Sequence, residues 1–95
     1  MTEENMLAAI SAELKRARAK FPVQSIWVTL AALTEEVGEL NAAILQLNHE
    51  PAKGVTPDAI RMEAVQVAVM AIRVAFDADM FGGERPKPHQ AGPPT

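Results

Sequence analysis

The spacing of apolar residues between Ser25 and Asn48 constrains the fold of this chain most strongly. Seven of these residues recur in alternating steps of four and three: Ile26, Leu30, Leu33, Val37, Leu40, Ile44 and Leu47. This period places them along one side of an α-helix, where they form a seam for packing against other helices. The segment is therefore predicted to be a long helix within a helical bundle.

Two further segments carry helical signals. Residues 3–20 follow a plausible N-cap, Thr2, and have apolar residues at helical spacing up to Phe21-Pro22. After a loop with Pro and Gly, Thr56-Pro57 supplies an N-cap and a proline at the first helical position. The third helix is predicted to run to about Phe81.

The third segment is apolar nearly all round from Ala64 to Phe76, as expected for a helix enclosed by several others. No segment shows the alternation of a strand, so the predicted fold class is all-α. We expect a bundle of three main helices per chain that is completed by oligomerisation, as a homodimer or homotetramer, because about eighty residues form only a marginally stable monomer.

The composition changes after residue 81. Residues 82–95 hold four of the seven prolines and three of the five glycines. Such a segment has little apolar surface to bury. We therefore expect one all-α domain over residues 1–81 and a flexible tail over residues 82–95.

Composition also narrows the function classes. A formal net charge of −3 lacks the positive field that nucleic-acid binding requires, and the absence of cysteine excludes thiolate chemistry and disulfides. The longest apolar run, Val67 to Ile72, is too short to cross a bilayer, and the first twenty residues contain no signal-peptide core. We therefore expect a cytoplasmic protein that binds neither nucleic acid nor membrane.

Acidic residues on the second helix form the first candidate site. At about 100° per residue, Glu36 and Glu39 lie on one side of the helix one turn apart, close enough to share a cation. Glu35 lies nearly opposite the apolar seam and is expected to face solvent. A Glu-Glu-x-x-Glu run is by itself most often a solvated face, so a second feature is needed.

The third helix supplies that feature. Five residues fall within an arc of about 80° on an otherwise apolar cylinder: Glu63, Gln66, Met70, Arg73 and Asp77. A carboxylate such as Glu63 needs a partner there. Antiparallel packing of the two helices would bring Glu36, Glu39, Glu63 and Gln66 together, and oxygen ligands of this kind suit Mg²⁺ or Mn²⁺. The competing interpretation is that Arg73 neutralises Glu63 or Asp77 in a structural ion pair.

These residues resemble a known family. Glu35-Glu36-Val37-Gly38-Glu39-Leu40, followed by Glu63-Ala64-Val65-Gln66 in an Ala/Val-rich helix, is similar to the all-α nucleoside triphosphate pyrophosphohydrolases of the MazG-like and dimeric dUTPase superfamily. Members resemble one another in a Glu-x-x-Glu motif and a later Glu-x-x-Asp motif whose four acids hold Mg²⁺. By position, Glu36, Glu39 and Glu63 match three of those ligands, and Gln66 stands where the family has Asp.

The resemblance implies an enzyme that hydrolyses a nucleotide to the monophosphate and pyrophosphate. Glu36 would be a catalytic and metal-holding residue, and Glu35 or a metal-bound carboxylate would orient the attacking water. Arg73 or the basic end of the first helix would contact phosphates. Trp27, which precedes the motif on the same helix, would stack on the base, although a packed core position is the more frequent role of such a tryptophan. The alternative is a non-catalytic helical oligomer that binds a nucleotide or a protein partner and has lost turnover with the fourth carboxylate.

Overall fold

The structure of the protein, a computed structural model, describes the backbone of residues 1–22 and 24–84 and the side chains of these ranges up to residue 78. The elements are α1 (Glu3–Lys20), α2 (Ile26–His49), a 3₁₀ turn, η1 (Pro51–Lys53), and α3 (Pro57–Glu84). The described ranges contain no strand, which confirms the all-α class. Helix α3 extends past its predicted end at Phe81, and most of the predicted tail, residues 85–95, lies outside the described residues.

Local capping explains where the helices begin. The hydroxyls of Thr2, Ser25 and Thr56 each accept a hydrogen bond from the backbone N–H three residues on, at 3.0, 3.2 and 3.1 Å. Gly54 follows η1 with φ = 73°, a left-handed conformation that glycine adopts without steric cost. The predicted starts at Thr2 and Thr56 are therefore confirmed.

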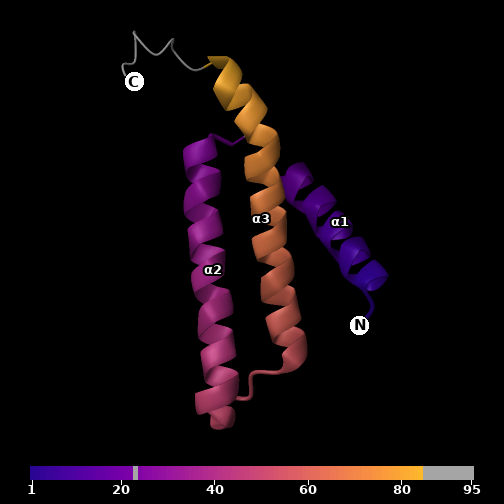
Figure 1. Cartoon of the computed structure of the whole chain (residues 1–95), viewed down its shortest axis with the longest axis vertical. Coiled ribbons are helices and arrows are strands. Elements are labelled where there is room, and N and C mark those ends of the chain that lie inside the picture. Colours follow the sequence, from indigo (N-terminus) through magenta and orange to yellow (C-terminus); the bar gives the residue numbers. More distant parts are fainter. Residues whose placement is uncertain (23, 85–95) are drawn as a thin grey trace.

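Helix α3 is the central element of the chain. Helix α2 runs antiparallel along it on one side, and α1 packs against it on the other side, diverging toward its own N-terminus (Figure 1). Both α1 and α2 contact α3, but within the described residues the backbones of α1 and α2 do not come into contact with each other.

The apolar core is small and lies between α1 and α3. Ala17, Val65 and Val69 are its buried members, and partly buried residues such as Ile10 and Leu14 pack against them. On α2, by contrast, every second member of the predicted seam is nearly half exposed: Leu30 at 45%, Val37 at 47% and Ile44 at 45%. The face of α2 that meets α3 is centred instead on the side of Thr29, which is fully buried.

No helix in the described part of the chain combines the length and apolar character that a membrane span needs.

Candidate metal centre

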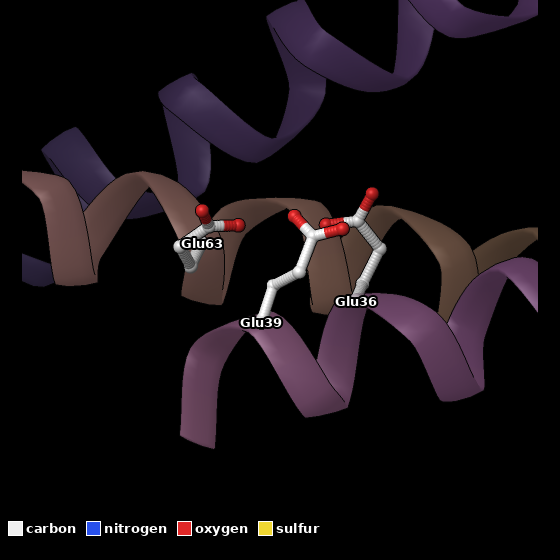
Figure 2. A group of neighbouring side chains, drawn as sticks. All are labelled: Glu36, Glu39 and Glu63. Carbon is white, nitrogen blue, oxygen red and sulfur yellow. The ribbon is translucent and has the colours of Figure 1, made fainter. Parts of the chain in front are cut away.

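Three carboxylates from two helices meet at the α2–α3 contact. Glu36 and Glu39 project from successive turns of α2 toward Glu63 on α3, and one oxygen of each lies within 4.8 Å of the others (Figure 2). The spacing of three residues aligns the first two, and the antiparallel packing supplies the third. Glu36, Glu39 and Glu63, here called the carboxylate triad, therefore cluster as a possible metal site.

Glu36 is the most strongly perturbed member of the triad. Its Oε1 atom is buried and has no hydrogen-bond partner. Burial raises the pKa of Glu36 above its ordinary value, and the negative charges of Glu39, Glu63 and Glu35 raise it further. Without a metal, the partly desolvated carboxylate of Glu36 is therefore repelled by neighbouring negative charges. A bound cation would remove this unfavourable electrostatic energy.

Among the described residues, no ion pair joins a basic side chain to the triad. The ion pairs of the described ranges join Arg16 to Glu13, Lys53 to Glu50 and Arg61 to Asp58. Arg73 donates instead to backbone carbonyls of α1 and of the segment after it. The structural ion pair of Arg73 with Glu63 or Asp77, which the sequence left open, is therefore not formed.

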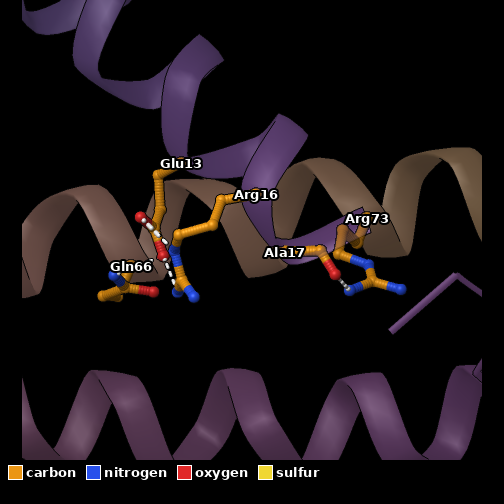
Figure 3. A network of polar contacts seen from close by, with 5 residues as sticks. All are labelled: Glu13, Arg16, Ala17, Gln66 and Arg73. Atoms are coloured by element: carbon orange, nitrogen blue, oxygen red, sulfur yellow. Dashed lines mark hydrogen bonds and ion pairs between the residues drawn. The ribbon is translucent and has the colours of Figure 1, made fainter. Parts of the chain in front are cut away.

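Gln66 has a partner that the sequence did not predict. Its Nε2 donates to the carboxylate of Glu13 at 2.9 Å, and the same carboxylate pairs with Arg16 (Figure 3). The hydrogen bonds from Arg16 and Gln66 lower the pKa of Glu13 to about 2. One sequence feature indicates that Glu13 has a polar partner: it lies between Ile10 and Ala17 on the apolar face of α1.

A cleft of about 290 Å³ lies between α1 and α2, and residues of α3 form its third side. Its walls come from all three helices and the segment that joins α1 to α2. The lining residues are Arg16, Ala17, Phe21, Gln24, Ala32, Glu36, Gln66, Met70 and Arg73. The cleft thus brings the unpartnered carboxylate of Glu36 into one space with Gln66 and Arg73.

Four predicted site residues do not line this cleft: Glu39 and Glu63, which belong to the triad, and Glu35 and Trp27. Glu35 is exposed, as predicted, and acts on the site through its charge on Glu36. Trp27 is 65% exposed and, nine residues before Glu36, lies on the opposite side of α2 by helical geometry. Within one chain the structure does not bring Trp27 to the triad, and its contact with a base stays a prediction.

The chain was compared with known families, proteins and structures. No family model, curated protein or solved structure matches it. What the residues and the geometry establish is an all-α chain of three packed helices with a carboxylate triad that could hold a metal ion.

Proposed function

We propose that this protein is a Mg²⁺-dependent pyrophosphohydrolase that converts a nucleoside triphosphate, deoxynucleotides included, into the monophosphate and pyrophosphate. One observation carries the proposal: the triad gathers three carboxylates within 4.8 Å, with one buried oxygen left without a partner. The reaction itself comes from the resemblance of Glu36, Glu39 and Glu63 to the pyrophosphohydrolase motifs.

The donor set fits a hard divalent cation. Carboxylate oxygens are the ligands that Mg²⁺ and Mn²⁺ prefer, and the repulsion that raises the pKa of Glu36 favours a cation among them. Glu36, Glu39 and Glu63 would hold the ion, with the amide oxygen of Gln66 as a fourth ligand. Bound Mg²⁺ at such a site neutralises phosphate charge and lowers the pKa of an attacking water.

The protein side chains supply position and proton transfer. Glu36 lines the cleft as well as the triad, so it lies where a nucleotide phosphate and a cation would meet. Because Glu35 is exposed and does not line the cleft, a carboxylate of the triad is the proposed acceptor that orients the attacking water. The half-buried position of Glu36 excludes part of the solvent and strengthens its interactions with charge.

We also propose that the active form is a homodimer or homotetramer. Leu30, Val37 and Ile44 lie seven residues apart on α2 and remain nearly half exposed. This row would be covered by a helix of another copy, which would complete the bundle that one chain leaves open.

Pyrophosphate release across a panel of nucleoside triphosphates, with and without Mg²⁺, tests the proposed activity. We expect release that depends on Mg²⁺, and its loss in Glu36→Gln and Glu63→Gln with the fold retained. Glu4→Gln, which removes an exposed carboxylate of α1, is the matched control and should keep the parental rate. Parental turnover in both triad variants would show that the site is elsewhere.

A second candidate function follows from Gln66. The position that carries Asp in the family it resembles is Gln66 here, so it supplies no carboxylate, and its amide donates to Glu13. The protein would then be a non-catalytic oligomer that binds a nucleotide or a protein partner. Nucleotide binding measured by calorimetry, together with the absence of pyrophosphate release, would favour this candidate over the enzyme.

A further inference from the structure

The carboxylate of Asp77 has an incomplete set of hydrogen-bond donors. Its Oδ2 accepts from the Thr29 hydroxyl at 3.3 Å, across the contact between α3 and α2. That hydroxyl has one proton, and it also lies 3.3 Å from the side-chain oxygen of Gln24 and 3.2 Å from the carbonyl of Ser25. An ionised carboxylate has about four acceptor positions, so Asp77 can accept further hydrogen bonds.

Asp77 lines a pocket of about 250 Å³, whose other walls are Arg18, Pro22, Arg73 and Phe76. The pocket is separate from the cleft that contains Glu36. Arg18 stacks on Phe76, with 4.6 Å between the guanidinium carbon and the centroid of the ring. The Phe76 side chain nevertheless remains 61% exposed. An accessible planar surface therefore lies in the same pocket as a carboxylate that can accept hydrogen bonds.

The charges of the pocket limit what it can bind. Arg73 lies one turn before Asp77 on α3, but its guanidinium donates to the carbonyls of Ala17 and Phe21. No ion pair in the described ranges includes either Arg73 or Asp77. Arg73 thus offsets the charge of Asp77 without using its oxygens. Because two guanidinium groups and one carboxylate line the pocket, a cationic ligand is disfavoured and a neutral one is accepted.

A neutral planar group with two adjacent N–H donors matches these features. The two donors suit the two oxygens of a carboxylate, and a planar ring stacks on aromatic and guanidinium surfaces. Among the common bases, guanine has such an edge, with its ring N1–H next to its exocyclic amino group. Adenine and cytosine place an acceptor nitrogen beside their amino group, and uracil and thymine have one ring N–H between two carbonyls. Each of these would direct an acceptor at the carboxylate.

We propose that the pocket of Asp77, Phe76 and Arg18 is a guanine subsite. The two oxygens of Asp77 accept hydrogen bonds from the N1–H and the amino group of the base, and the base stacks against the Phe76–Arg18 pair. The assignment of a nucleotide as the molecule that carries the base rests on the proposed function. GTP and dGTP would then be the preferred substrates of the proposed enzyme.

The position of the subsite is compatible with phosphates at the triad. Thr29, which is bonded to Asp77, and Glu36 lie seven residues apart on the same side of α2, about 10 Å along the helix axis. This separation is comparable to the length of a nucleoside monophosphate. Arg73 lines both the pocket and the cleft that contains Glu36, so the two spaces adjoin at this residue. The subsite differs from the base contact expected of Trp27, which lies on the opposite side of α2 from Glu36.

Calorimetry of the full chain with GMP, AMP and xanthosine monophosphate, in buffer with Mg²⁺, tests the subsite. We expect the parent to bind GMP at least about tenfold more tightly than either of the others. Xanthine has a carbonyl oxygen where guanine has its amino group. Asp77→Asn offers one acceptor and one donor, so it should bind xanthosine monophosphate more tightly than GMP. Its amide oxygen can still accept from Thr29, and circular dichroism should therefore show an unchanged fold.

Asp58→Asn is the matched control. It makes the same chemical change on α3, at an exposed residue that lines neither the pocket nor the cleft. This variant should keep the parental preference for GMP within about twofold.

Four results would overturn the subsite. They are no binding of GMP by the parent at millimolar concentration, equal binding of GMP and AMP by the parent, an unchanged ratio of GMP to xanthosine monophosphate binding in Asp77→Asn, and equal loss of every nucleotide in that variant. Failure of the proposed function looks different. A preference for GMP that depends on Asp77, in a protein that releases no pyrophosphate, would refute the enzyme and support the subsite. Equal release of pyrophosphate from GTP and ATP would support the enzyme and refute the subsite.

Discussion

Replacing Gln66 by Asp tests how the fourth position of the candidate site is used. In the structure, the Nε2 of Gln66 donates to Glu13 at 2.9 Å, and the Glu13 side chain is only 15% exposed. Gln66→Asp removes this donor and places a carboxylate next to another carboxylate. It also restores the acid that the pyrophosphohydrolase motif carries, so the two interpretations of Gln66 predict opposite responses to Mg²⁺.

The size of the effect follows from two contributions. Loss of a hydrogen bond to a charged group costs about 1.5–3 kcal/mol, and two unit charges about 5 Å apart repel by ~3 kcal/mol at an effective dielectric of about 20. The guanidinium of Arg16 on Glu13 and the nearby solvent offset part of that repulsion. We therefore expect Gln66→Asp to lower the free energy of unfolding by about 2–4 kcal/mol at pH 7 without metal.

Urea unfolding at one fixed protein concentration, followed by circular dichroism, measures this loss. The fixed concentration matters because self-association would add to the apparent stability. Gln66→Ala loses the hydrogen bond without adding charge and separates the two contributions. The double variant Glu13→Gln, Gln66→Asp exchanges donor and acceptor, so it should recover most of the stability.

Two outcomes would refute the reasoning at different points. A metal-free Gln66→Asp variant as stable as the parent would show that the bond to Glu13 contributes nothing. If the variant is destabilised and millimolar Mg²⁺ does not restore it, Gln66 does not belong to the cation site. Restoration by Mg²⁺, with higher turnover than the parent, would support a site shared by all four positions.

Three further predictions concern charge and assembly. Because the folded-state pKa of Glu36 is raised, its ionised form destabilises the metal-free fold, so Glu36→Gln should be more stable than the parent at pH 7. That advantage should shrink as the pH falls through the raised pKa toward the ordinary value of 4.5, and unfolding curves at several pH values that show a constant difference would contradict it. Glu13 has a lowered pKa, so its stabilising contribution should be complete above pH 4.5 and lost as the pH falls through about 2. Acid titrations of parent and Glu13→Gln should therefore converge near pH 2, and convergence already at pH 4 would argue against the pairing. Light scattering at micromolar concentration should show an oligomer for the parent and a smaller species for Ile44→Lys, which places a charge in the exposed row of α2; a folded parental monomer would rule out obligate assembly.

Local chemistry made the helices predictable from sequence. The caps at Thr2 and Thr56 act over three residues, and the four-three period of α2 depends only on helical geometry. The same arithmetic placed Glu36 and Glu39 on one side of α2, where the structure has them in the triad with Glu63. The caps and the apolar period depend on interactions within one helix. The triad depends only on the antiparallel packing of two consecutive helices.

Other features of the site required the tertiary structure. The partner of Gln66, the carbonyls that bind Arg73 and the cleft all arise because α1 packs on α3 and stays apart from α2. The periodicity of α1 identifies its apolar face but not which helix that face meets. Glu13, on the same face, therefore had no predictable partner.

The orientation of α2 illustrates the same limit. Its sequence determines a broad apolar seam, but within one chain α3 covers only the side near Thr29 and leaves Val37 nearly half exposed. A helical period specifies directions around one axis, whereas packing selects among those directions according to the neighbours that are present. The sequence by itself determined the helices and the pairing of acids on α2, and only the tertiary structure decided which sides of them meet to form the cleft and the triad.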